Sequence, residues 1–204
     1  MRIDPGAVMW SAPERERAGR PLLVLLHGLG SHEGDLFGLG PYLPLGPVLA
    51  SVRAPIPHQG GYAWYPAGER AEQGQHADAS AVAVLEWLDT LSYTSVGLLG
   101  FSQGGVIATQ LMRHRPHFFR YAVNLAGFVM PDENPGDEEL ARVAPPVFWG
   151  RGTVDDVIAD SLIEYTQTWL PLHTTMTERI YEGLGHGVNG AQLRDVQEFI
   201  RVVG

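Results

Sequence analysis

A glycine-flanked serine is the clearest chemical feature of the sequence. The motif G-x-S-x-G spans positions 100–104 with Ser102 at its centre. The apolar run Val96–Leu99 precedes it and the helical stretch Gln103–His114 follows it. A serine at such a sharp turn between strand and helix exposes its hydroxyl above the sheet, and small neighbours let other backbone pass close by. The motif therefore predicts that Ser102 is a nucleophile for acyl transfer.

A nucleophilic serine needs a histidine as its base, and with this motif the acid and then the histidine follow in the chain. His186 lies in a glycine-rich loop after the last predicted strand, at the same edge of the sheet as Ser102. His173 precedes that strand and is expected on the surface at the opposite edge. We therefore expect His186 to be the base.

The acid that orients this histidine is expected after the apolar run Val147–Trp149. Two carboxylates stand there, Asp155 and Asp156. We predict Asp155 as the third member of a catalytic triad, with Asp156 as the close alternative. The other interpretation of Asp155 is that it caps the helix that follows.

Stabilising the oxyanion requires two backbone N–H groups, one from the residue after the serine and one from a loop after an earlier strand. These criteria point to Gln103 and to Leu29, which stands between two glycines. His27 begins the same loop, and a metal site is the alternative interpretation of its acidic and histidine neighbours. Their spacing matches no standard zinc motif, so His27 is expected to brace the loop and no metal is expected.

Short apolar runs alternate with amphipathic stretches along the chain. This alternation predicts an α/β fold with a mostly parallel central sheet flanked by helices on both faces. The stretches 55–75 and 131–139 do not fit the alternation, and the second is expected to be a solvated acidic loop. The predicted strands are Ala7–Ser11, Leu22–Leu26, Val48–Val52, Val96–Leu99, Ala122–Leu125, Val147–Trp149 and, near the edge, Thr175–Tyr181; the predicted helices are Ser80–Leu91 with Ser80 as N-cap, Gln103–His114, Asp160–Leu170 and Ala191–Val203.

The composition excludes several other chemistries. Among the 204 residues there is no cysteine, and all 14 basic residues are arginine. Thiolate nucleophiles, Cys-ligated metals and lysine Schiff bases are therefore impossible. A net charge of −9 disfavours nucleic acid as a partner. The sequence shows no signal peptide at its start and no apolar run long enough to span a membrane, so a cytoplasmic protein without cofactor is expected.

Several motifs together resemble the carboxylesterase/lysophospholipase/acyl-protein thioesterase family of α/β-hydrolases, over nearly the whole chain. The resemblance implies a compact α/β-hydrolase domain over residues 1–204, with a short lid-like loop at 55–75. It also implies that Trp64 and Tyr65 border the substrate. The motifs are Leu26-His27-Gly28-Leu29-Gly30, Arg53-Ala54-Pro55, Trp64-Tyr65, Gly100-Phe101-Ser102-Gln103-Gly104-Gly105, Gly152-Thr153-Val154-Asp155 and Gly185-His186.

The predicted activity is hydrolysis of carboxylic esters with short to medium acyl chains, by a serine carboxylesterase that forms an acyl-enzyme. Thioesterase or lysophospholipase activity is the alternative, and an inactive binding protein with the same fold is a remote one. Arg151, Pro66 and Asp156 depart from the family pattern, which predicts a different pocket from that of the family. A small-molecule ester is the expected partner, and formation of a homodimer is left open.

Overall fold

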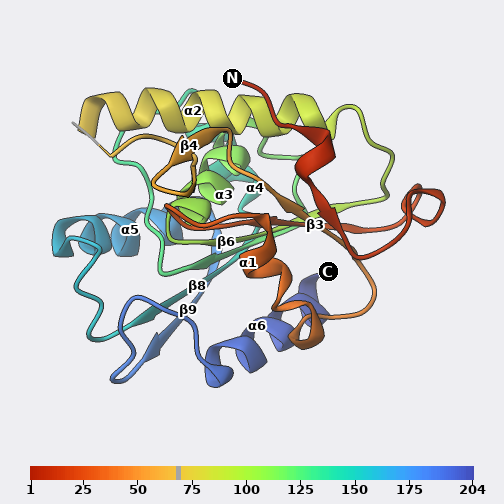
Figure 1. Ribbon diagram of the computed structural model, residues 1–204. Coiled ribbons are helices and arrows are strands. Elements are labelled where there is room, and N and C mark those ends of the chain that lie inside the picture. The colour runs from red at the N-terminus through yellow and green to blue at the C-terminus, as the bar shows by residue number, and fades with distance from the viewer. Residues whose placement is uncertain (68–69) are drawn as a thin grey trace.

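A seven-stranded sheet forms the centre of the computed structural model, which describes residues 1–67 and 70–204 (Figure 1). The strand order is β1-β3-β2-β6-β7-β8-β9, and all neighbours pair in parallel except β1, which is antiparallel to β3. The predicted α/β class is therefore confirmed, and β9 lies at the sheet edge as expected. The strands are β1 (Met9–Trp10), β2 (Leu22–Leu26), β3 (Val48–Val52), β6 (Val96–Phe101), β7 (Tyr121–Leu125), β8 (Pro146–Gly152) and β9 (Thr175–Tyr181).

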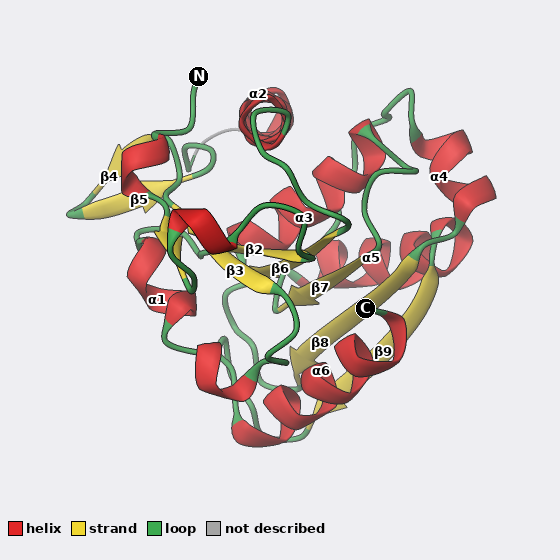
Figure 2. Cartoon of the chain, turned by 90° about the vertical axis from the view of Figure 1, so that its right-hand side faces the viewer, coloured by secondary structure: helices red, strands yellow, loops and turns green. Residues whose placement is uncertain are grey.

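Helices cover both faces of this sheet (Figure 2). In β2 the alternate residues Leu22, Val24 and Leu26 pack into one apolar cluster, with side chains of α2, α3, α4 and α5. Leu23 and Leu25 pack into a second cluster with α1 and α6 on the other face. Both faces of the strand are buried, which is why it is an uninterrupted apolar run. The helices are α1 (Glu33–Phe37), α2 (Arg70–Leu88), α3 (Gln103–His114), α4 (Asp137–Val143), α5 (Asp160–His173) and α6 (Gly190–Val203).

The stretch 55–75 contains regular structure in the place where a lid-like loop is expected. Strands β4 (Ile56–His58) and β5 (Gly61–Ala63) form an antiparallel hairpin. Its two turn residues, Gln59 and Gly60, both have positive φ, as a tight two-residue hairpin turn requires. The first residues of α2 complete the stretch, while positions 68 and 69 lie outside the described residues.

The expected start of the second helix is wrong. Helix α2 begins at Arg70, so Ser80 lies inside it rather than at its N-cap. The Ser80 side chain is fully buried and its hydroxyl donates to the carbonyl oxygen of Trp64. Because α2 begins before Ser80, the hydroxyl bonds a carbonyl outside the helix instead of capping it. The local sequence does not indicate this partner.

The acidic stretch 131–139 is also more ordered than expected. Helix α4 begins at Asp137, whose carboxylate accepts two hydrogen bonds of 2.7 Å from the guanidinium of Arg113. The Arg113 side chain is fully buried and also donates to the carbonyl oxygens of Met130 and Asp132. A buried arginine from α3 thus organises a segment that looks like a solvated loop in the sequence, because the interaction joins residues that are distant in the chain.

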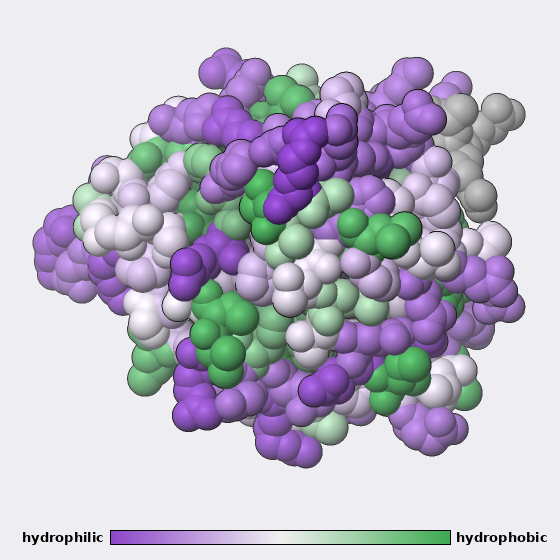
Figure 3. All heavy atoms as spheres, turned by 180° about the vertical axis from the view of Figure 1, so that it is seen from behind, coloured by the Kyte–Doolittle hydropathy of each residue, from purple (hydrophilic) through white to green (hydrophobic). Residues whose placement is uncertain are grey.

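The surface is mixed in polarity. On the face turned away in Figure 1, hydrophobic side chains form separate small groups among hydrophilic ones (Figure 3). In the described part of the chain, no helix has both the length and the apolarity that a membrane span requires.

Candidate active site

Ser102 stands at a sharp turn between β6 and α3. Its backbone angles, φ 54° and ψ −119°, lie in a strained region that non-glycine residues seldom occupy. The turn is possible because the flanking glycines have no side chains. A Cβ at Gly104 would overlap the carbonyl oxygen of Leu26, and one at Gly100 would overlap the carbonyl oxygen of Gly104. The glycines of the motif therefore let β2, β6 and α3 approach one another closely beneath the serine.

Ser102, His186 and Asp155 form a continuous hydrogen-bonded line. The Ser102 hydroxyl donates to His186 Nε2 over 2.9 Å, and His186 Nδ1 donates to Asp155 Oδ2 over 2.8 Å. The carboxylate requires the imidazole to hold its proton on Nδ1, which leaves Nε2 free to accept the serine proton. The three side chains come from loops at the carboxyl ends of β6, β8 and β9, so parallel pairing of the strands brings them to one edge.

Asp155, rather than Asp156, bonds the histidine. The Asp155 side chain is only 3% exposed, whereas Asp156 is exposed to solvent. The second carboxylate oxygen of Asp155 accepts the backbone N–H groups of Val157 and Ile158 at 3.0 and 3.3 Å. Asp155 therefore orients the imidazole and stabilises its own turn. The interpretation of Asp155 as a helix cap is wrong, because α5 begins only at Asp160 and its N-cap is Ala159.

Two backbone N–H groups beside Ser102 remain available for an oxyanion. Gln103 is the first residue of α3, and the N–H of a first helical residue has no partner within the helix. Within the described residues, the Leu29 N–H also donates to no protein group, and Leu29 lies with Gln103 in the lining of one cavity. The helix N-terminus adds a partial positive charge at this point, which favours a developing negative charge.

His27 fixes the peptide that carries the Leu29 N–H. The ring is fully buried, and its Nδ1 donates to the carbonyl oxygen of Gly28 over 2.7 Å. Its Nε2 accepts the backbone N–H of Ala54 over 3.1 Å, which keeps the proton on Nδ1. In a trans peptide the Gly28 carbonyl and the Leu29 N–H point in opposite directions within one plane. The hydrogen bond from His27 therefore aims the Leu29 N–H.

The burial of His27 keeps its imidazole neutral. Burial lowers the pKa of His27, and the nearby carboxylates of Glu33 and Asp35 oppose this only in part. The described residues contain no group of three or more side chains that could hold a metal ion. The two hydrogen bonds of its ring, to Gly28 and from Ala54, make His27 the brace of the loop that the sequence predicts.

The side chain of Gln103 joins the serine turn to residues 64 and 65. Gln103 Oε1 accepts the Trp64 N–H over 3.0 Å, and Gln103 Nε2 donates to the Tyr65 carbonyl over 2.9 Å. The Trp64 indole N–H in turn donates to the carbonyl oxygen of His27 over 2.8 Å. The buried amide of Gln103 thereby links the start of α3 to Tyr65 in the wall of the site. Through Trp64 it is also linked to the loop that carries Leu29.

The expectation that Trp64 and Tyr65 both border the substrate needs a correction. Tyr65 lines the cavity above Ser102, but Trp64 is fully buried and does not line it. The reason is the indole hydrogen bond to His27, which holds the ring behind the loop rather than in the cavity. Trp64 is a support for the site and Tyr65 is part of its wall.

A cavity of about 570 Å³ contains Ser102 and His186 in its lining. An apolar wall comes from Phe101, Phe128 and the start of α5, with Ile158 and Leu162. Ser31 and Asp35, which follow β2 on the other side of β6 from β7 and β8, add polar groups to the lining. This volume and this mixture of surfaces are usual for sites that bind small organic molecules.

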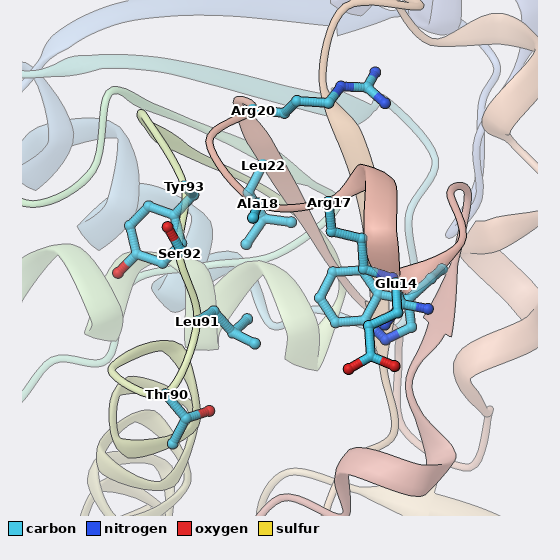
Figure 4. A pocket seen from close by; sticks show the side chains of 10 residues that line it. Glu14, Arg17, Ala18, Arg20, Leu22, Thr90, Leu91, Ser92 and Tyr93 are labelled. Atoms are coloured by element: carbon cyan, nitrogen blue, oxygen red, sulfur yellow. The ribbon is translucent and has the colours of Figure 1, made fainter.

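A smaller hollow, of about 180 Å³, is lined by a different set of residues, whose side chains are drawn in Figure 4. Leu22, Leu91 and Tyr93 help to line it, at the start of β2 and in the loop before β6. It therefore belongs to the amino ends of the parallel strands, whereas Ser102 follows the carboxyl end of β6.

A known protein family matches nearly the whole chain. The model of the phospholipase/carboxylesterase family matches residues 11–203. The chain belongs to this family. Its α/β-hydrolase fold and the family resemblance seen in the sequence motifs are thereby confirmed, and it is a member of a family of hydrolases.

Individual relatives are distant in sequence. The chain is 24% identical over 222 residues to acyl-protein thioesterase 1 of Eremothecium gossypii, a match that covers 92% of this chain and 89% of the relative. Among solved structures it is similar to esterase PE8, with a TM-score of 0.79, 24% identity and 100% of both chains covered. It is also similar to the carboxylesterase of Bacillus cereus, with a TM-score of 0.80, 19% identity and 97% and 94% of the two chains covered. These structures share the fold of this family member.

Two supporting roles in the site are absent from the sequence prediction. The side chain of Gln103 and the indole of Trp64 act through partners about 40 residues or less away in the chain but on different elements. A signal existed for the first: an amide side chain directly after the serine, at the start of a buried helix, must find partners inside the protein. Nothing local indicates which backbone groups those partners are.

Proposed function

We propose that this family member is a serine carboxylesterase that hydrolyses carboxylic esters with short to medium acyl chains. The observation that carries the proposal is the line from Ser102 through His186 to Asp155 in the lining of a cavity of about 570 Å³. A serine paired in this way can act as a nucleophile, because the histidine accepts its proton as the hydroxyl attacks. The cavity supplies the space in which an ester carbonyl meets that hydroxyl.

The reaction begins with attack on the ester carbonyl. His186 Nε2 takes the proton of Ser102, the new C–O bond forms, and the carbonyl oxygen becomes an oxyanion between the N–H groups of Leu29 and Gln103. One donor of this kind typically lowers the barrier by about 3–4 kcal/mol. The imidazolium, stabilised by Asp155, returns its proton to the leaving alcohol as the ester C–O bond breaks.

Water then hydrolyses the acyl-enzyme through the same sequence of proton transfers. His186 takes a proton from water, the hydroxide attacks the acyl carbonyl, and the Ser102 oxygen leaves with the proton. The acid product departs and the free enzyme is restored. The whole cavity of about 570 Å³ must hold the acyl chain and the alcohol together, which supports a preference for short to medium chains.

Thioesterase activity is the second candidate, because the relative from Eremothecium gossypii is named acyl-protein thioesterase 1. The same serine chemistry cleaves a thioester. A series of p-nitrophenyl esters from acetate to palmitate, with a thioester of matched acyl chain, distinguishes the two. The carboxylesterase proposal predicts the highest kcat/KM for a short or medium ester; a clear preference for the long-chain thioester would favour the alternative.

The decisive test of the chemistry is Ser102→Ala. We expect this variant to fold normally and to lose hydrolysis of p-nitrophenyl butyrate, since it lacks the nucleophile. A fluorophosphonate probe should label the wild-type protein and not the variant. Undiminished hydrolysis by Ser102→Ala would refute the proposal.

A further inference from the structure

Asp35 places a carboxylate in the lining of the cavity that contains Ser102. One of its oxygens accepts the Ser31 hydroxyl over 2.6 Å, and no described cation forms an ion pair with it. The neighbouring Arg53 is held by Glu33 through both carboxylate oxygens. Asp35 therefore contributes a negative charge to the cavity that the described side chains do not neutralise.

This charge is unfavourable for the reaction of a neutral ester. Attack by Ser102 creates an oxyanion at Leu29 and Gln103, and a carboxylate in the lining of the same cavity repels it. Asp35 lines the same cavity as Leu29 and Gln103, and because its side chain is exposed its field there is sensitive to salt. A cationic group on the substrate would remove the conflict, because it would pair with Asp35 during the formation of the oxyanion.

The polarity of the cavity lining also differs between the residues that follow β2 and those that follow β7 and β8. The lining residues that follow β7 and β8, Phe128, Ile158 and Leu162, suit an apolar acyl chain. The lining residues that follow β2, Ser31 and Asp35, are left for the alcohol. Resting on the proposed esterase function, we propose that the preferred substrates are esters of a cationic alcohol, such as a quaternary ammonium alcohol, and that Asp35 selects them. The alternative role of Asp35 is local, because a carboxylate in the first turn of α1 also stabilises that helix end.

The test compares two esters of nearly equal shape. Butyrylcholine carries a trimethylammonium group where 3,3-dimethylbutyl butyrate carries a neutral tert-butyl group. We expect kcat/KM, followed by proton release, to be about five-fold higher for the cationic ester at about 10 mM salt. The ratio should fall towards one at about 1 M salt, where the Debye length is only about 3 Å.

Substitution of Asp35 then separates selection from helix stability. Asp35→Asn should bring the ratio of the two esters close to one at low salt, while Asp35→Glu, which keeps the charge, should retain the preference. The control Glu86→Gln removes an exposed carboxylate of α2 that is outside the cavity lining, and it should leave the ratio as in the wild type.

Each outcome has one meaning. The role of Asp35 is overturned if the wild-type kcat/KM for the cationic ester is no higher than that for the neutral ester. It is also overturned if the preference survives in Asp35→Asn. The first comparison uses the wild-type protein alone, so it does not depend on the folding of a variant. Hydrolysis of the neutral ester in the same assay shows that the esterase function itself stands. If no ester, including p-nitrophenyl butyrate, is hydrolysed, the proposed function fails and this inference fails with it.

Discussion

Two substitutions of His27 should separate its two hydrogen bonds. The amide of glutamine reaches the position of the ring Nε2, so His27→Gln keeps a partner for the Ala54 N–H and loses the donor to the Gly28 carbonyl. Asparagine reaches the position of Nδ1, so His27→Asn has the opposite effect. We argue that the bond to the Gly28 carbonyl orients the Leu29 N–H and that the bond from the Ala54 N–H anchors the loop. Turnover should then respond to His27→Gln, and stability should respond to His27→Asn.

The expected magnitudes follow from the partners that remain. Complete loss of an oxyanion donor lowers kcat by about 10²–10³-fold. In His27→Gln the Gly28 carbonyl still accepts the Ser31 N–H at 3.3 Å, so the peptide keeps part of its alignment. We therefore expect kcat to fall by about 10- to 100-fold with little change in KM, because the donor acts on the oxyanion rather than on the bound ester.

His27→Asn should instead lower stability. It leaves the buried N–H of Ala54 without a partner, which costs about 1–3 kcal/mol of the free energy of unfolding. Its kcat should stay within a few-fold of the wild type. The assays are initial rates with p-nitrophenyl butyrate and unfolding in urea. The reasoning is refuted if His27→Gln keeps its kcat within two-fold, or if His27→Asn loses as much kcat as His27→Gln.

Two further predictions concern the supports of the site. Because burial lowers the pKa of His27 below its ordinary value of 6.5, the unfolded chain binds a proton before the folded chain does as the pH falls. The free energy of unfolding should thus decrease from pH 6.5 down to the lowered pKa. In His27→Gln this part of the decrease should vanish, whereas the control His76→Gln, at an exposed position, should keep it. An unchanged dependence of stability on pH in His27→Gln would contradict the prediction. Gln103→Met should cost about 2–4 kcal/mol of stability, because it leaves Trp64 N–H and the Tyr65 carbonyl unpaired in a buried place. The exposed Gln197→Met serves as its control, and urea unfolding that shows equal stability for both variants would argue against the role given to Gln103.

The sequence alone determined the sheet and the position of its reactive edge. Runs such as Leu22–Leu26 are apolar at every position because strands buried on both faces demand it, and they match the observed strands closely. Parallel strands place the loops after them at one edge, so Ser102, Asp155 and His186 could be predicted as neighbours from their order and from the strands they follow. Local chemistry was sufficient here, because a G-x-S-x-G turn requires its glycines wherever it occurs.

Only the tertiary structure decided what holds this edge in place. Ser80 and Trp64 look like a helix cap and a pocket residue in the sequence, but each is fully buried and bonded to a distant segment. The stretch 131–139 looks like a solvated loop, but the buried Arg113 of α3 bonds it. The choice between Asp155 and Asp156 was of the same kind, because both precede the same helix and only the position of His186 distinguishes them. Such roles depend on which backbone groups lack partners after the chain has folded, and a one-dimensional pattern does not contain that information.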